Sequence, residues 1–128
     1  MTEISFDHLH IKSADPAASA QFYVEAFGAL LMSQGEVNGK LRFVIDLSGL
    51  SVFIEGKAPV ARDALPAPAG GLEHLGLRVS NLDTLATRLE AMGAKFAIPP
   101  KTSRPGVRVA FLYGPDGEYI ELIERSPA

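Results

Sequence analysis

Hydrophobic and polar residues alternate in two stretches that lie far apart in the chain. Residues 6–12 (FDHLHIK) and 72–78 (LEHLGLR) change character at nearly every step, which is the period-two pattern of a half-buried β-strand. An offset of 66 residues superimposes the two stretches and places His8 on His74. The chain therefore contains an internal repeat, which predicts two similar structural modules.

The same offset also matches the later apolar segments of the two repeats. It overlays residues 40–45 on 106–111 and 52–55 on 118–121, so that Arg42 falls on Arg108 and Glu55 on Glu121. These segments predict further strands in each half, at 41–47, 51–55, 107–113 and 118–123. Turn sequences separate the strands of each pair, at Ser48-Gly49 and at Gly114-Pro115-Asp116-Gly117.

A helix is predicted after the first strand of each repeat. In the first repeat Asp15 suits the N-cap, Pro16 suits the first helical position, and Gly28 marks the end. In the second repeat Asn81 is the equivalent cap and the helix should end near Gly93. Four apolar residues of this second helix recur at helical spacing and predict a stripe facing the core: Leu82, Leu85, Leu89 and Met92.

Two segments are rich in helix- and strand-breaking residues. Residues 56–71, rich in Pro, Ala and Gly, predict a linker that is long enough to cross between modules or to reach a second subunit. Residues 97–106 contain three prolines and predict a surface loop, which is also a candidate lid. We therefore expect one domain of two repeats, with a first module at 1–55, the linker at 56–71 and a second module at 72–128.

Composition excludes several classes of partner and cofactor site. The 128 residues include 12 Lys plus Arg against 15 Asp plus Glu, so the net charge of −3 gives no basic surface to attract nucleic acid or anionic lipid. The sequence has no cysteine, so any bound metal must be held by nitrogen and oxygen ligands. Residues 1–10 lack the features of a signal peptide and no apolar run is long enough to span a membrane, so we expect a cytoplasmic protein.

Two histidines and two glutamates recur at the 66-residue offset. Taken singly, a histidine in a strand or a glutamate at a strand end is more often structural or solvated than functional. Together, the four form a nitrogen and oxygen set that suits zinc, nickel, cobalt, manganese or ferrous iron. The candidate metal ligands are His8, Glu55, His74 and Glu121.

Two further motifs give the chain a resemblance to a known family. The stretch Asp7-His8-Leu9-His10-Ile11, followed by Asp15, Ser19 and Phe22-Tyr23, resembles the opening of glyoxalase, bleomycin-resistance and dioxygenase modules. The stretch from Gly114 to Leu122 resembles their closing strand. The chain is thus similar over nearly its whole length to the vicinal oxygen chelate superfamily.

The resemblance implies an α+β fold of paired βαβββ modules whose curved sheets enclose a metal cavity. His8, His74 and Glu121 match the triad that most metal-dependent members share, and glutamate at the fourth position, Glu55, resembles glyoxalase I. A divalent metal with four protein ligands leaves two positions for a small-molecule substrate with adjacent oxygens. Related proteins also pair, so we expect a homodimer, with the ligands held by one chain or shared between two.

The ligand set favours a lyase, isomerase or epimerase that transfers a proton next to a carbonyl group. By resemblance to glyoxalase I, Glu121 is the first candidate for the base and Glu55 the second, with His10 as an accessory acid or base. The candidates for substrate binding are Lys12, Arg42, Arg108 and Tyr119. Glutathione is the weakest part of the resemblance, because Lys12 replaces an arginine of that family and Gly56-Lys57-Ala58-Pro59 lacks its polar residues.

Two other functions fit parts of the same pattern. In an extradiol-type ferrous dioxygenase, His8, His74 and Glu121 would bind the metal and Glu55 would take no part. In a metal-free protein that sequesters a drug or other small molecule, the cavity walls alone would bind the ligand. The presence of all four ligand types argues against this second alternative.

Overall fold

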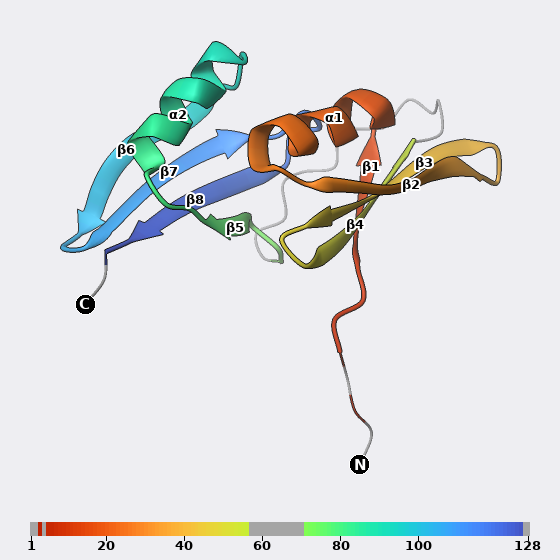
Figure 1. The fold of residues 1–128 in the computed structure, drawn as a ribbon, viewed down its shortest axis with the longest axis horizontal. Helices are drawn as coiled ribbons and strands as arrows, with labels where there is room; N and C mark the ends of the chain where they lie inside the picture. The colour runs from red at the N-terminus through yellow and green to blue at the C-terminus, as the bar shows by residue number, and fades with distance from the viewer. Residues whose placement is uncertain (1–2, 4, 57–70, 127–128) are drawn as a thin grey trace. The chain divides into compact units, whose positions relative to one another are not determined.

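A computed structural model describes residues 3, 5–56 and 71–126 (Figure 1). The chain divides into two compact units, Met1–Leu65 and Pro66–Ala128. Most of the predicted linker, at residues 57–70, lies outside the described residues. No helix in the described part of the chain has the length and apolar character needed to cross a membrane.

Each unit consists of one helix packed on a four-stranded mixed sheet. The first unit contains β1 (Leu9–Ser13), α1 (Pro16–Phe27), β2 (Leu30–Val37), β3 (Lys40–Leu47) and β4 (Leu50–Gly56). The second contains β5 (Leu75–Arg78), α2 (Leu82–Ala91), β6 (Phe96–Arg104), β7 (Val107–Tyr113) and β8 (Tyr119–Arg125). The strand orders are β1-β4-β3-β2 and β5-β8-β7-β6. The predicted α+β fold of two βαβββ modules is therefore confirmed.

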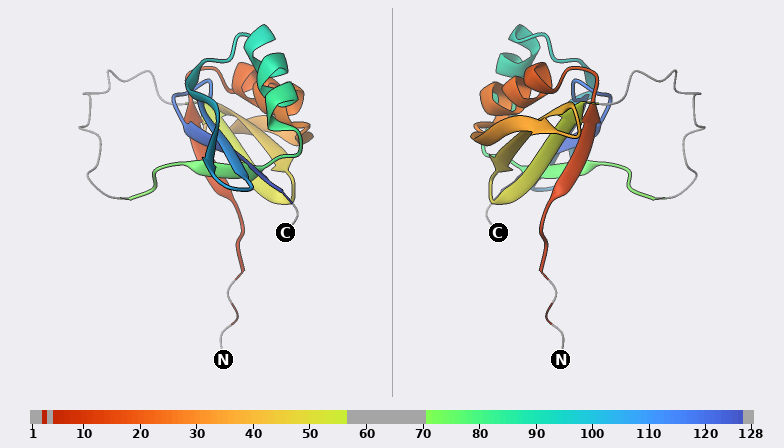
Figure 2. Two further views of the ribbon diagram at one scale, coloured as in Figure 1. Left: turned by 90° about the vertical axis from the view of Figure 1, so that its left-hand side faces the viewer. Right: turned by 90° about the vertical axis from the view of Figure 1, so that its right-hand side faces the viewer.

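The first and last strands of each unit lie side by side and run parallel. β1 pairs with β4 in the first unit, as Figure 2 shows, and β5 pairs with β8 in the second. The other neighbouring strands are antiparallel. This arrangement places the residues at the start of each unit beside those at its end, which brings the two ends of each repeat together.

The signals that predicted the first helix are confirmed. The Asp15 side chain accepts a hydrogen bond from the Ala18 amide at 3.1 Å, and Pro16 occupies the first helical position. Gly28 ends the helix in the left-handed conformation, with φ of 70°, and its amide donates to the carbonyl of Val24. Local sequence is therefore sufficient to set both ends of α1.

The second helix begins as predicted, but a different residue caps it. Asn81 adopts a left-handed conformation with φ of 58°, and its side chain makes no capping hydrogen bond. The Leu82 amide instead donates to Oε1 of Glu124 at 2.7 Å. Glu124 lies on β8, so this cap depends on strand packing and could not be found from residues near the helix start.

The predicted apolar stripe of α2 is only partly confirmed. Leu82 and Leu89 are fully buried, whereas Leu85 is half-buried and Met92 is 40% exposed. The helix ends at Ala91, so Met92 lies beyond the face that packs on the sheet.

The prediction of a loop or lid at residues 97–106 is wrong. Residues 96–104 form β6, the edge strand beside β7. The pairing register shifts between Ile98 and Lys101, around Pro99 and Pro100. Proline has no amide hydrogen for a ladder bond, but an edge strand with an irregular register tolerates it.

The two faces of each sheet carry different kinds of side chain. In the first unit, Phe43, Ile45, Leu47, Val52 and Ile54 are buried on the face that packs on α1. Because side chains alternate along a strand, the opposite face carries Arg42, Val44, Phe53 and Glu55. The second unit repeats this division, with Ala110, Leu112, Ile120 and Leu122 buried on its helix side. Side chains that could bind a ligand or take part in a reaction are therefore expected on the helix-free faces.

Candidate functional site

The second unit brings two of the predicted metal ligands into contact. His74 immediately precedes β5 and Glu121 lies on β8, on the helix-free face. Nε2 of His74 lies 3.1 Å from Oε1 of Glu121. The other ring nitrogen, Nδ1, lies 3.1 Å from Oε1 of Glu73. A carboxylate on Nδ1 orients the imidazole so that Nε2 faces Glu121.

This geometry suits two neighbouring ligands of one ion. Nitrogen and oxygen ligands lie about 2.0–2.2 Å from a zinc-sized ion, so two at right angles lie about 3 Å apart. The separation of 3.1 Å between Nε2 and Oε1 matches that spacing. A carboxylate on the far ring nitrogen is the usual outer partner of a metal-binding histidine. The donor set of His74 and Glu121 therefore fits a divalent metal.

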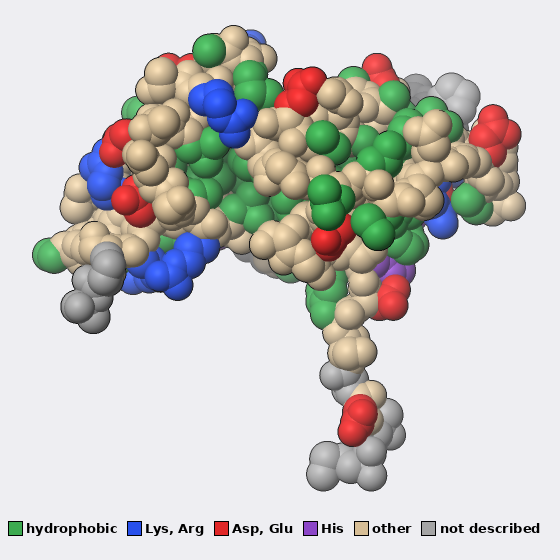
Figure 3. Space-filling model, viewed as in Figure 1, with side chains coloured by type: hydrophobic (Ala, Val, Ile, Leu, Met, Phe, Trp, Pro, Cys, Tyr) green, Lys and Arg blue, Asp and Glu red, His purple; other side chains and the backbone are tan. Residues whose placement is uncertain are grey.

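The first unit repeats only part of this arrangement. Nδ1 of His8 lies 2.6 Å from Oδ2 of Asp7, which parallels the contact between His74 and Glu73. Among the described residues no carboxylate contacts the other ring nitrogen of His8. The ring instead stacks on Phe53, with ring centroids 4.0 Å apart and planes 6° apart. In Figure 3, histidine and acidic side chains reach the surface together near the N-terminal segment.

Strand register explains why Phe53 lies beside His8. In the first unit His10 is opposite Phe53, two residues after His8. In the second unit Gly76 is opposite Glu121, two residues after His74. When the two histidines are superimposed, the structural equivalent of Glu121 is therefore Phe53. Glu55 lies two residues further along β4, where it is opposite Lys12.

The repeat offset is thus not constant along the chain. The offset is 66 at the histidines. On β3 and β7 it is 67, because Val44 lies opposite Phe53 and Phe111 lies opposite Glu121, so that Val44 corresponds to Phe111. The final turn then adds a residue, because Asp46 pairs with Ser51 whereas Tyr113 pairs with Tyr119. The offset on the last strands is therefore 68, and the overlay of Glu55 on Glu121 does not hold in the structure.

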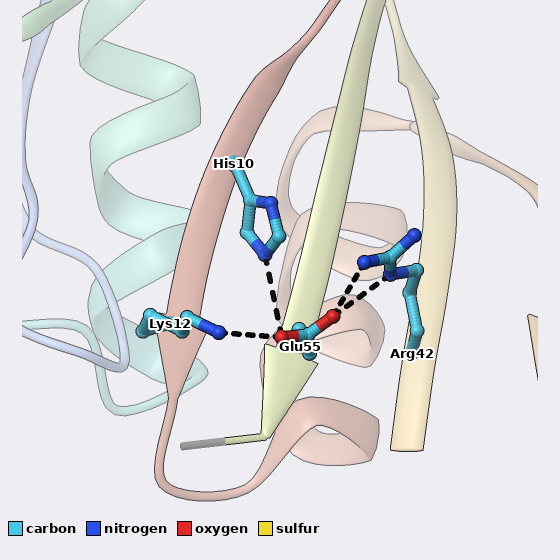
Figure 4. A network of polar contacts seen from close by, with 4 residues as sticks. All are labelled: His10, Lys12, Arg42 and Glu55. Atoms are coloured by element: carbon cyan, nitrogen blue, oxygen red, sulfur yellow. Dashed lines mark hydrogen bonds and ion pairs between the residues drawn. The ribbon is translucent and has the colours of Figure 1, made fainter. Parts of the chain in front are cut away.

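Glu55 is buried in a network of basic side chains on the helix-free face (Figure 4). Its Oε1 accepts a hydrogen bond from Nζ of Lys12. Its Oε2 accepts from Arg42 Nε at 3.0 Å and Nη2 at 2.5 Å. Nε2 of His10 lies 3.9 Å from Oε1. These contacts engage both carboxylate oxygens, so Glu55 could bind a metal only by giving up ion pairs.

The pKa values of two members of the network are lowered, for different reasons. Hydrogen bonds from Lys12 and then Arg42 lower the pKa of Glu55 to about 2, against the opposing effect of burial. Burial lowers the pKa of His10; Glu55 opposes this, whereas the charges of Lys12 and Arg42 add to it. Near neutral pH, Glu55 is therefore a weak proton acceptor and His10 is an uncharged imidazole that can accept a proton.

The lowered pKa of Glu55 predicts a pH-dependent contribution to stability. A carboxyl group with a pKa of about 2 when folded and 4.5 when unfolded stabilises the fold fully above pH 4.5. That contribution is lost as the pH falls from about 4.5 to about 2. In urea unfolding, the stability difference between the parent and Glu55→Gln should shrink over this interval. The exposed Glu90→Gln is the control, and a difference that stays constant with pH contradicts the prediction.

The remaining substrate-binding candidates lie on different faces. Arg108 lies on the helix side of its sheet, where Nη2 and Nε contact Asp83 at 2.6 and 3.1 Å. The structure therefore does not bring Arg108 together with Glu121.

Tyr119 lies on the same face as Glu121 and stacks on Phe111 with ring centroids 5.1 Å apart. Phe111 also contacts the His74 ring edge to face, so it connects Tyr119 to His74 on this face.

Within the described residues, no three His, Cys, Asp or Glu side chains form a cluster that could hold a metal ion. The candidate ligands instead form two sets, His8 on the first unit and His74 with Glu121 on the second. The two carboxylates that contact the histidines, Asp7 and Glu73, were not among the residues predicted from the sequence. Both are also separated by 66 residues and precede a histidine, so the repeat contained the signal.

Comparison with known proteins identifies relatives along nearly the whole chain. The family model for the Glyoxalase/Bleomycin resistance protein/Dioxygenase superfamily matches residues 5–122. The uncharacterized protein YwbC of Bacillus subtilis (strain 168) is 34% identical over 123 residues, covering 93% of this chain and 96% of that protein.

Solved structures show the same fold at lower sequence identity. The glyoxylase/bleomycin resistance protein/dioxygenase domain from Frankia sp. EAN1pec has a TM-score of 0.80 at 21% identity, covering 99% of this chain and 96% of that one. The V278E mutant of glyoxalase I from Zea mays has a TM-score of 0.77 at 21% identity, covering 94% of this chain and 44% of that one.

Proposed function

This chain belongs to the glyoxalase/bleomycin resistance protein/dioxygenase superfamily, and from that premise we propose that it is a divalent-metal-dependent enzyme with three protein ligands. The ligands are His8, His74 and Glu121. The observation that carries the proposal is the pair formed by His74 and Glu121, whose facing atoms lie 3.1 Å apart while Glu73 holds the far side of the ring. Glu55, the fourth ligand expected from the sequence, is assigned to the ion-pair network instead.

The proposed reaction is proton transfer next to the carbonyl group of a small molecule that carries neighbouring oxygens. When bound, the ion would act as a Lewis acid that polarises the carbonyl oxygen. Zinc, nickel, cobalt, manganese and ferrous iron all suit the donor set. This class of reaction includes the glyoxalase-type lyases, isomerases and epimerases.

Among the described residues, His10 has the chemistry best suited to move the proton. Its lowered pKa keeps the imidazole uncharged near neutral pH, and its side chain is one-third exposed on the helix-free face. Glu55 is a poorer base because Lys12 and Arg42 stabilise its charged form. We assign His10 to accept the proton from one carbon and return it to the next, with Glu121 as a ligand rather than the first candidate base.

The test measures metal binding and proton transfer separately. Metal-loaded protein should exchange carbon-bound hydrogen of small hydroxycarbonyl compounds with deuterium from D₂O. His10→Gln should lower the exchange rate by about a hundredfold to ten-thousandfold, the usual contribution of a catalytic base. His10→Gln should also keep the metal stoichiometry of the parent. Equal exchange rates in the parent and the variant would remove His10 from the mechanism.

An extradiol-type ferrous dioxygenase is the second candidate, and the position of Phe53 favours it. A phenyl ring at the structural equivalent of Glu121 leaves two histidines and one carboxylate, which is the ligand type of non-haem ferrous oxygenases. Oxygen uptake with catechols by the iron-loaded protein, without deuterium exchange, would select this function. A protein that binds no divalent metal would instead fit the metal-free binding proteins of the superfamily.

We also propose that two chains form a homodimer through β2. All eight residues of this edge strand are exposed, including Leu30, Leu31 and Met32 at 50–63%. An exposed edge strand offers unpaired backbone groups to a second chain, and the first three residues of β2 are apolar. Mixing His8→Ala with Glu121→Gln chains tests whether two chains share a metal site, because shared ligands would restore binding in the mixed dimer.

A further inference from the structure

The ion-pair network of the first unit contains more positive than negative charge. Lys12 and Arg42 each carry one positive charge, whereas Glu55 supplies the single negative charge that both contact. The surplus is one positive charge on the helix-free face of the sheet. Two cations on one carboxylate therefore exceed what neutralising Glu55 requires.

Both cations keep hydrogen-bond donors beyond those that Glu55 uses. Arg42 directs Nε and Nη2 at Oε2, which leaves the two hydrogens of Nη1 without a partner among the described residues. Lys12 uses one of three ammonium hydrogens on Oε1. The Lys12 side chain is 50% exposed and that of Arg42 is 26% exposed, whereas that of Glu55 is only 7% exposed. The carboxylate lies beneath while the cations reach solvent.

This positive cluster is next to the metal-ligand candidate of the same unit. The Arg42 guanidinium lies over the Phe53 ring, 5.4 Å from its centroid, and His8 stacks on that ring at 4.0 Å. Phe53 therefore contacts both His8 and Arg42. His10, the assigned proton carrier, approaches the same ring, with centroids 6.1 Å apart. A small molecule could reach all these groups from one face of the sheet.

We propose that Lys12 and Arg42 form a subsite for an anionic group of the substrate, a carboxylate or a phosphate-type group. Glu55 is the positioning residue: it binds Lys12 at one carboxylate oxygen and Arg42 at the other, and so holds the two partly exposed cations on either side of itself. The substrate class is then a hydroxycarbonyl compound with an anionic tail. The inference that the bound anion belongs to a substrate rests on the proposed function, but the anion site itself does not.

The test uses metal-free protein, so that it is independent of metal binding. Inorganic phosphate is titrated against the parent by NMR at constant ionic strength, with acetate in a second series. The informative variant is Arg42→Gln/Glu55→Gln, which removes one positive and one negative charge together and so keeps the parent's net charge. Replacing Glu55 together with Arg42 also avoids leaving the buried Glu55 carboxylate without one of its ion-pair partners.

The second unit provides a matched control. Arg108→Gln/Asp83→Asn likewise removes one arginine–carboxylate pair, but from the helix side of its sheet. Phosphate should bind the parent and this control alike, and should bind Arg42→Gln/Glu55→Gln about tenfold more weakly, because charge-assisted hydrogen bonds are lost. Lys12→Gln should also weaken binding. Backbone spectra of each variant verify that it is folded.

Two results would overturn the subsite. One is a parent protein whose amide signals near Phe53 do not respond to phosphate or acetate. The other is equal phosphate affinity in the two double variants. Either result, with metal binding intact, would leave the proposed function standing and remove only the anion site. Phosphate binding as expected in a protein that binds no divalent metal would overturn the proposed function alone.

Discussion

Glu121→Gln should weaken divalent-metal binding by more than about a hundredfold, because loss of an outer partner alone typically costs tenfold to a hundredfold. Glu121 is a direct ligand in the proposed site, and its Oε1 lies 3.1 Å from the His74 ring. Metal affinity is measured by titration with a chromophoric competitor. In a parallel measurement, added metal should raise the melting temperature of the parent but not that of the variant.

Glu55→Gln is the matched control for this prediction, since it makes the same chemical change on the other unit. It should leave metal affinity unchanged within about threefold, which is less than the effect of an outer partner. The reason is that Glu55 contacts Lys12 and Arg42, and Phe53 occupies the position equivalent to Glu121. If Glu55→Gln weakens metal binding as much as Glu121→Gln does, the four-ligand site expected from the sequence is correct.

Phe53→Glu should have the opposite effect and tighten metal binding by about tenfold or more, in the range seen when a metal site gains or loses a supporting group. The substitution places a carboxylate beside His8, as Glu121 lies beside His74. Phe53→Leu is the control, because it removes the aromatic ring without adding a ligand. Titrations of both variants are compared with that of the parent.

One outcome of the Phe53 experiment would contradict the equivalence of Phe53 and Glu121, and another would reveal competition from Arg42. If Phe53→Glu and Phe53→Leu bind metal equally, the introduced carboxylate does not reach the ion. If Phe53→Glu gains affinity only when Arg42 is also replaced, the guanidinium that lies over the Phe53 ring captures the new carboxylate. The first result removes Phe53 as the equivalent of Glu121, and the second shows that the network competes for it.

Much of the fold was predictable from local sequence. The cap at Asp15, the end at Gly28 and the turn at Ser48-Gly49 depend on residues near one another in the chain. The histidines precede β1 and β5 at equivalent places, as the offset of 66 predicted. Two of the edge strands, β2 and β6, were harder to predict, because β2 is exposed on both faces and β6 contains two prolines.

The candidate site depended much more on tertiary structure. An overlay of sequence segments treats each strand separately, whereas a carboxylate's partners depend on which residues of neighbouring strands lie opposite it. Arg42 and Arg108 match in sequence, yet they lie on different faces of their sheets, because the register requires an offset of 67 on those strands. A slip of one residue moves a side chain to the other face.

The sequence by itself determined the two modules, the first helix and the pair of histidines, because short-range hydrogen bonding and periodicity control those features. Only the tertiary structure decided that Glu55 belongs to an ion-pair network and that Phe53 is the counterpart of Glu121. The physical reason is the pairing of β1 with β4 and of β5 with β8, since these contacts join residues more than 40 positions apart. Their register depends on the length of every intervening turn.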